Sequence, residues 1–170
     1  INGDHMLIRE SGSALDCLIF NSTPKNLNKI DLLYSQTLEM LSKSKKFYCS
    51  QEIIFMIQSS LCSNIKTILL KLKNNPSKGK EIISKYVEQT LSIFYDLLSN
   101  RNTFIYEEGL YAISALICAT NTDDSYIELF TPNTFERLMN EFVFQALKSG
   151  NEGVINAACL LIGNLFRFLS

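Results

Sequence analysis

The chain has few of the residues that make tight turns. Its 170 residues include only 7 glycines and 3 prolines, while leucine, isoleucine, serine, asparagine and lysine are abundant. An all-β fold needs frequent Gly- and Pro-rich turns, so this composition favours long helices. A hydrophobic fraction of 46% and a charged fraction of 19% are those of a folded globular chain rather than a disordered one.

An excess of charge and a long apolar run are also absent. The formal net charge is -1, so composition gives no reason to expect direct nucleic-acid binding or an anionic membrane partner. No run of about 18 apolar residues occurs, which argues against membrane insertion. Two basic clusters, Lys43–Lys46 and Lys71–Lys80, fall where helices are expected to end. Positive charge there complements the helix dipole, so we interpret both as solvated helix ends.

The residues that metal and nucleophile chemistry require are scarce. The single histidine is His5, and five scattered cysteines are typical of reduced, mostly buried thiols in an intracellular protein. Cys62 and Cys118 have no histidine to activate them, and no Cys or His cluster has metal-ligand spacing. Adjacent Glu107 and Glu108 would not face each other on a helix. We therefore predict a protein that is not an enzyme and needs no cofactor or metal.

Apolar residues recur at helical spacing in seven stretches that are separated by short polar breaks. Pro24 ends the first stretch, Ser50 is a possible N-cap, and Gly150 stands where a helix C-terminus favours glycine. Residues 74–79 form the clearest loop, and a short apolar piece, 126–130, precedes the sixth stretch. The predicted helices cover residues 6–22, 27–42, 51–72, 80–98, 104–120, 134–148 and 152–169.

The last predicted helix is apolar on more than one side, and such a helix must be covered from more than one side. Its main stripe is widened by Val154 and Ala157, and Gly163 indicates tight packing or a local bend. The remaining chain repeats a unit of helix, short break and helix that could cover it, at a spacing of roughly 40 to 45 residues. The main stripe consists of Ala158, Leu161, Ile162, Leu165 and Leu169.

This spacing predicts an all-α fold, an α-solenoid in which helix pairs stack on one another. Three helical hairpins follow one leading helix, and residues 1–170 form a single unit. Because the chain begins and ends on the second helix of a pair, we expect it to be a segment of a longer array. An obligate helical oligomer would instead need one long exposed apolar stripe.

Three segments resemble one family of helical repeats. Val154–Arg167, with its Ala-Ala pair followed by Ile-Gly-Asn-Leu-Phe-Arg, is similar to the second helix of a HEAT repeat in importin-β (karyopherin-β). Glu107–Leu116 is similar to that family's Glu-Asp-Ala-Leu-x-Ala-Val-Ser-x-Leu, and Ser60–Lys71 to its Leu-Leu-Cys-Ala-Thr-Leu segment. The matches follow the family's order and span most of residues 7–170. Asn164 and Gly109 depart from it, standing where the pattern has Asp and Ala.

The resemblance implies a central-to-C-terminal segment of a nuclear transport receptor. Such a segment would work in the cytoplasm, the nucleus and the nuclear pore or envelope. Its concave face, made of second helices, would bind an importin-α-type adaptor or basic cargo and the Ran GTPase. Its convex face, made of first helices, would offer apolar slots to Phe-Gly nucleoporins.

Two sets of residues are candidates for these contacts. Acidic residues near the starts of second helices would face a basic partner, although a carboxylate in a first turn also simply stabilises the helix dipole. They are Glu52, Glu107, Glu108 and Glu152. Apolar residues of the fourth and sixth helices would line the Phe-Gly slot, although such residues more often belong to the core. They are Phe94, Tyr95, Leu98, Phe135, Leu138 and Phe142.

An alternative function is that of a HEAT- or armadillo-type scaffold that holds the subunits of an enzyme complex together. Composition does not distinguish the two. Apolar slots between adjacent first helices would distinguish the two functions, because passage through the nuclear pore needs such slots and a static scaffold does not.

Overall fold

The computed structural model describes residues 2–23, 26–100, 102–120 and 131–169, and within them the chain is helical, without a strand. A 3-10 turn (Ser44–Lys46) follows α2, and a π-helical segment (Leu138–Val143) joins α6 to α7 in one rod. The predicted all-α fold is confirmed, while the apolar piece 126–130 lies outside the described residues. The helices are α1 (Asn2–Phe20), α2 (Leu27–Lys43), α3 (Gln51–Lys73), α4 (Pro76–Leu98), α5 (Thr103–Thr120), α6 (Pro132–Arg137), α7 (Phe144–Leu147) and α8 (Glu152–Leu169).

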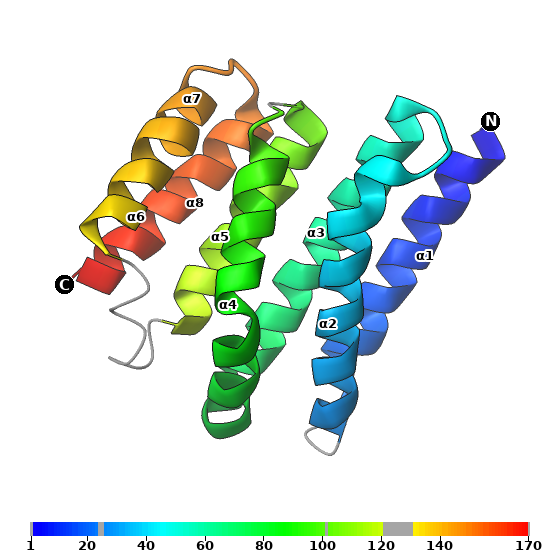
Figure 1. Cartoon of the computed structure of the whole chain (residues 1–170), viewed down its shortest axis with the longest axis horizontal. Helices are drawn as coiled ribbons and strands as arrows, with labels where there is room; N and C mark the ends of the chain where they lie inside the picture. Colours follow the sequence, from blue (N-terminus) through cyan, green and yellow to red (C-terminus); the bar gives the residue numbers. More distant parts are fainter. Residues whose placement is uncertain (1, 24–25, 101, 121–130, 170) are drawn as a thin grey trace.

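The helices lie in two layers (Figure 1). In the first layer α1, α3, α5 and α8 follow one another, and the second layer consists of α2, α4 and the α6–α7 rod. Each helix of the second layer packs on the helix that follows it in the chain: α2 on α3, α4 on α5, and α7 on α8. These three pairs are the predicted hairpins, and α1 precedes them.

Neighbouring helices of the first layer run parallel. Between α1 and α3, Ser63 bonds to Asp16, 47 residues away, and further along Lys71 bonds to the carbonyl oxygen of Phe20, 51 residues away. Between α5 and α8 the pair Ser114 and Asn164 is 50 residues apart. The same placement of one helix on the next therefore recurs along the layer.

The central helix is α3, which contacts α1, α2, α4 and α5. By length and composition alone it is also apolar enough to cross a membrane, a test that the buried core helix of a globular protein passes as well. Ile65, Ile68 and Leu69 are fully buried by the surrounding helices. Packing within the two layers thus buries 44% of the most apolar stretch of α3.

The last helix, α8, lies at one end of the first layer rather than at its centre. It packs on α5 and on the α6–α7 rod, while Leu160 and Phe166 are exposed. A Cβ added at Gly163 would meet nothing within 4 Å, so the close contact predicted there is wrong. Val154 and Ala157, which widen the stripe, are buried, whereas Leu160 and Phe166 are not covered by the described part of the chain.

The helix ends follow local sequence signals, with one correction. Ser50 caps α3, its hydroxyl accepting a hydrogen bond from the Ile53 amide at 3.4 Å, and Gly150 has the left-handed φ of 70°. The loop predicted over 74–79 is too long, because only residues 74 and 75 lie between the helices and α4 already begins at Pro76. Proline at a first helical position loses no bond. Gly79 lies inside this first turn, where a Cβ would collide with the Leu72 carbonyl oxygen.

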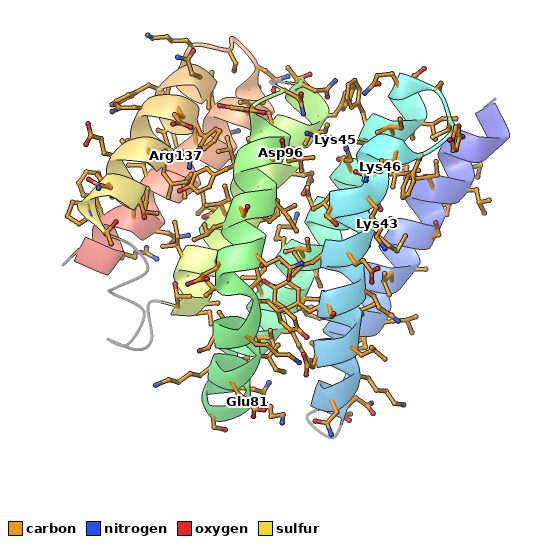
Figure 2. The ribbon with its side chains drawn as sticks, viewed as in Figure 1. Lys43, Lys45, Lys46, Glu81, Asp96 and Arg137 are labelled. Carbon is orange, nitrogen blue, oxygen red and sulfur yellow. The ribbon has the colours of Figure 1, made fainter. Side chains whose placement is uncertain are left out.

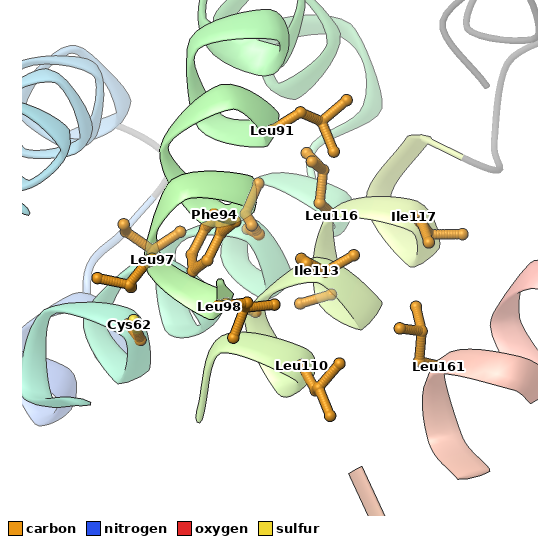
Figure 3. Close-up of a cluster of buried hydrophobic side chains, with 14 of the residues drawn as sticks. Cys62, Leu91, Phe94, Leu97, Leu98, Leu110, Ile113, Leu116, Ile117 and Leu161 are labelled. Carbon is orange, nitrogen blue, oxygen red and sulfur yellow. The ribbon is translucent and has the colours of Figure 1, made fainter. Parts of the chain in front are cut away.

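The hydrophobic core fills the space between the two layers. Figure 3 shows its middle, where side chains of α4 and α5 interdigitate with Cys62 of α3 and Leu161 of α8. Between α2 and α4 the buried Tyr34 hydroxyl donates to Thr90 Oγ1 at 2.8 Å, and Thr90 in turn donates to the Tyr86 carbonyl. The α4 and α5 side chains labelled there are Leu91, Phe94, Leu97, Leu98, Leu110, Ile113, Leu116 and Ile117.

Candidate functional site

A groove of about 730 Å³ runs along the outer face of α3, between α1 and the start of α5. Its volume falls within the range of ligand-binding sites, roughly 300 to 1,000 Å³. All its walls come from the first layer, so it opens on the face turned away from α2 and α4. We call it the α3 groove. It is lined by Ile8, Arg9, Gly12, Ser13, Asp16, Glu52, Phe55, Met56, Ser59, Ser60, Ser63, Asn102, Phe104 and Glu108.

Small side chains create this groove where α1 meets α3. Gly12 lets the two helices approach closely, because a Cβ there would collide with Ser60 Oγ. Ser59 and Ser63 are also short, so the wall of α3 is set back along two turns. Phe55 is partly buried against the core, while Phe104, at the start of α5, is 73% exposed. Apolar atoms contribute more of the groove surface than polar atoms do.

Asp16 is held in the groove by two neutral donors. Ser63 Oγ donates to Asp16 Oδ2 at 3.0 Å, and the Asn64 amide, turned so that its nitrogen faces α1, donates to Asp16 Oδ1 at 2.9 Å. Neither donor carries a charge, so neither balances the negative charge of a carboxylate. The Asp16 side chain also keeps free lone pairs, because a carboxylate accepts about four hydrogen bonds. Sequence reasoning missed Asp16, because only the packing of α1 on α3 brings it to residues 47 positions away.

Two of the four predicted acidic residues line the α3 groove. Glu52 is exposed in the first turn of α3. Glu108 is half-buried and forms an ion pair with Lys66 at 2.9 Å, and Lys66 also lies 5.4 Å from the centroid of the Tyr111 ring. Glu52 thus presents an accessible charge to the groove, while much of the Glu108 charge is already balanced.

The other two predicted acids lie outside the groove. The Glu107 carboxylate lies against Gly153, in the first turn of α8, so close that a Cβ at Gly153 would collide with it. Glu152 is the exposed first residue of α8. A negative charge near a helix N-terminus stabilises the helix dipole, and that structural role accounts for both positions. The structure does not bring the four acids together in one site.

The predicted Phe-Gly slot requires a correction. Phe94, Leu98, Leu138 and Phe142 are buried in the core, with no more than 3% of each side chain exposed. They fill the space between the layers, so the phenylalanine ring of a Phe-Gly peptide cannot reach them. Phe135 is half-buried against the same core, as is Tyr95, whose ring stacks on Phe142 with centroids 5.5 Å apart. Helical spacing alone did not separate core residues from slot residues.

A shallower groove of about 670 Å³ does lie between α4 and α6, and Tyr95 is part of it. Arg137 of α6 lies 4.0 Å from the Tyr95 ring centroid, and Arg137 also bonds to Glu141 at 3.1 Å. Burial raises the pKa of Tyr95 above its usual value. Five of the seven residues that line this α4–α6 groove have polar or charged side chains, although apolar atoms contribute somewhat more of its surface. The lining residues are Glu88, Leu91, Ser92, Tyr95, Asp96, Ser99 and Arg137.

The basic cluster at the end of α2 is engaged in ion pairs. Lys45 Nζ lies 2.7 Å from Asp96 Oδ2 of α4, and Lys43 pairs with Glu39 one turn earlier. Figure 2 shows Lys45 and Asp96 pointing toward each other across the gap between α2 and α4. The pair with Lys43 lowers the pKa of Glu39. These contacts agree with the interpretation of this cluster as a helix end.

The described residues include no group of three or more His, Cys, Asp or Glu side chains that could hold a metal ion. Cys62 is buried, and burial raises the pKa of its thiol far above the ordinary value. Lys73 Nζ lies 3.0 Å from Cys118 Sγ at the ends of α3 and α5. The α3 groove, with a volume of about 730 Å³, is the feature of the described residues that we consider as a partner site.

No protein-family model, curated protein or solved structure matches this chain. The function must therefore be argued from the grooves and from the arrangement of the helices.

Proposed function

We propose that the chain is a non-enzymatic, protein-binding segment of a HEAT-repeat solenoid, of the kind from which importin-β-type nuclear transport receptors are built. The supporting observation is the repeated layer. Helices α1, α3, α5 and α8 run parallel at separations of 42 to 51 residues, and α3, α5 and α8 are each covered by the helix before them. Stacked helix pairs of this size create extended binding surfaces.

In this proposal the two layers bind different partners. A basic adaptor or cargo segment and the Ran GTPase bind the layer of α1, α3, α5 and α8, where Asp16 and Glu52 supply accessible negative charge in the α3 groove. Phe-Gly nucleoporins bind the second layer, where the α4–α6 groove around Tyr95 is the open site. The protein then carries cargo between cytoplasm and nucleus through the pore.

One observation favours the scaffold alternative. An apolar ring needs an apolar slot, yet the described α4–α6 groove has only Leu91 and Tyr95 as apolar or aromatic members, and Arg137 covers the Tyr95 ring. A scaffold subunit needs no such slot, and it would use the α3 groove in the same way. The two functions therefore differ in what the second layer binds.

An NMR titration with a Phe-Gly repeat peptide tests the transport proposal. We expect saturable shifts confined to α4 and α6 around Tyr95 and Arg137, and their loss in Tyr95→Ala. The matched control is Tyr48→Ala, because Tyr48 is fully exposed in the turn before α3. Absence of shifts at millimolar peptide, with the chain folded, would reject the transport role and leave the scaffold function.

A further inference from the structure

A lysine and a cysteine meet where α3 and α5 end. Lys73 is the last residue of α3, and Cys118 lies two residues before the end of α5. The Lys73 side chain donates a hydrogen bond to the Cys118 sulfur, with 3.0 Å between Nζ and Sγ. The two residues are 45 positions apart in the sequence, so the packing of α3 on α5 is what brings them together.

This contact distinguishes Cys118 from the other four cysteines. Cys17, Cys49 and Cys159 are exposed and Cys62 is fully buried, whereas Cys118 is partly buried. Within the part of the chain that the structure describes, Cys118 alone has a lysine nitrogen within hydrogen-bond distance of its sulfur. A small oxidant can therefore reach this sulfur from solvent, and a nitrogen nucleophile already lies beside it.

The Lys73 side chain is available to react. No ion pair among the described residues engages Lys73, whereas Lys45 and Lys66 each pair with a carboxylate on another helix. The lysine ammonium stands on a flexible stem of four carbons, so its nitrogen can close on the sulfur without a change in the backbone. Loss of a proton from the ammonium leaves a lone pair directed at the atom that it now contacts.

We propose that Cys118 and Lys73 form a site of oxidative modification, at which a peroxide converts the hydrogen-bonded pair into a covalent S–N bond, a sulfenamide. In the first step the Cys118 thiolate attacks one oxygen of hydrogen peroxide and the O–O bond breaks. The products are a sulfenic acid and one water. The sulfur is oxidised, and the peroxide oxygen is reduced.

The second step forms the crosslink. Lys73 Nζ, as the neutral amine, attacks the sulfur of the sulfenic acid, and the S–O bond breaks with loss of a second water. Sulfenic acids condense in the same way with a backbone nitrogen. One thiol, one amine and one hydrogen peroxide thus give one sulfenamide and two waters.

The bond would join two neighbouring helices of the first layer at the same end. It closes a loop of 45 residues that contains α4, and a crosslink of this kind restricts the unfolded chain. It also fixes the spacing of one helix pair against the next. This modification goes beyond the proposed binding function, and neither residue lines the α3 groove or the α4–α6 groove. Its failure would leave the binding proposals intact.

The test is intact-mass spectrometry of Cys17→Ser/Cys49→Ser/Cys159→Ser, which removes the exposed cysteines. The remaining Cys62 lies eleven residues before Lys73, about 16 Å along α3, which is too far for a disulfide with Cys118. After hydrogen peroxide we expect a loss of about 2 Da, because two hydrogens leave as water. A tryptic digest should contain one crosslinked species with Lys73 and Cys118, and the urea midpoint should rise.

In the same background, Lys73→Arg keeps the positive charge but removes the primary amine. It should give no loss of 2 Da and no rise of the urea midpoint, and Cys118 should remain a sulfenic acid that dimedone labels. The matched control is Lys71→Arg, which makes the same change two residues earlier and should behave like the parent. Circular dichroism confirms that each variant is folded.

Several results would overturn the assignment. One is a Cys118 thiol that peroxide leaves unchanged, and another is a sulfenic or sulfinic acid that persists beside Lys73. The same loss of 2 Da in folded Lys73→Arg would show that the partner is a different group. A gain of about 14 Da would place an oxygen between sulfur and nitrogen and would reject the direct S–N bond.

Discussion

A buried side-chain amide joins α8 to α5, and its removal should show how much this contact contributes to the free energy of unfolding. Asn164 Nδ2 donates to Ser114 Oγ at 2.7 Å and to the Ser114 carbonyl oxygen at 3.3 Å. Asn164 is 7% exposed and Ser114 is fully buried. Replacing either partner leaves a buried polar group unsatisfied, so the pair should contribute measurably to stability.

The expected magnitudes follow from the bonds that each substitution removes. Asn164→Ala loses two bonds of about 1 kcal/mol each and gains about 0.5 kcal/mol of helix propensity, a net loss of roughly 1.5 kcal/mol before any cavity term. Ser114→Ala loses only the hydroxyl bond, a net loss of about 0.5 kcal/mol. The double variant should therefore show a coupling energy of about 1 kcal/mol, because both single variants lose the same 2.7 Å bond.

Urea unfolding followed by far-UV circular dichroism measures these differences, provided the m-values agree. The control cycle combines Asn164→Ala with Ser42→Ala, at the exposed end of α2, and should be additive within about 0.3 to 0.5 kcal/mol. A coupling energy below about 0.3 kcal/mol for Asn164 and Ser114 would refute the inference that this bond holds α8 on α5.

Three further perturbations test the fold. Phe94→Ala should destabilise the chain by about 3 to 5 kcal/mol, because Phe94 is fully buried; a thermal shift near zero would mean that it is an open slot residue after all. Gly150→Ala should cost about 1 kcal/mol in urea unfolding, since its φ of 70° strains any residue with a Cβ, and an unchanged midpoint would contradict this. Burial raises the pKa of Tyr34, so the folded state holds that proton more tightly than the unfolded chain, whose tyrosines ionise near pH 10. The contribution of Tyr34 to stability should therefore be fully present below about pH 10 and be lost as the pH rises above it, so stability should fall less steeply above pH 10 in Tyr34→Phe. Parallel pH curves for the two proteins in that range would exclude Tyr34 as the cause.

The helices could be predicted from the sequence because their signals are local. The 3.6-residue spacing of apolar side chains, the cap at Ser50 and the glycine at Gly150 each act within one or two turns, and the structure has helices where these signals place them. The error at residues 74–79 is also local. Next to Asn74 and Asn75, Pro76 favours a loop in the sequence, although proline is equally suited to the first position of a helix.

The candidate site could be predicted only in part. Glu52 was found from its position at a helix start, because that signal lies within one turn. Asp16 was not found, since its partners Ser63 and Asn64 lie on another helix and nothing in the local pattern distinguishes it from other surface acids. Phe94 and Leu98 were assigned to a slot because an apolar residue shows the same spacing whether it faces the core or the surface.

By itself, the sequence determined which segments are helical and most of their ends, although not the start of α4, because backbone hydrogen bonding and side-chain periodicity depend on neighbours within a few residues. Tertiary structure alone decided which apolar faces are covered, that α3 rather than α8 is central, and that Gly12, Ser59 and Ser63 leave a groove beside Asp16. Those outcomes depend on how residues about 40 to 50 positions apart pack together, and packing at that separation leaves no mark in the pattern of a single helix.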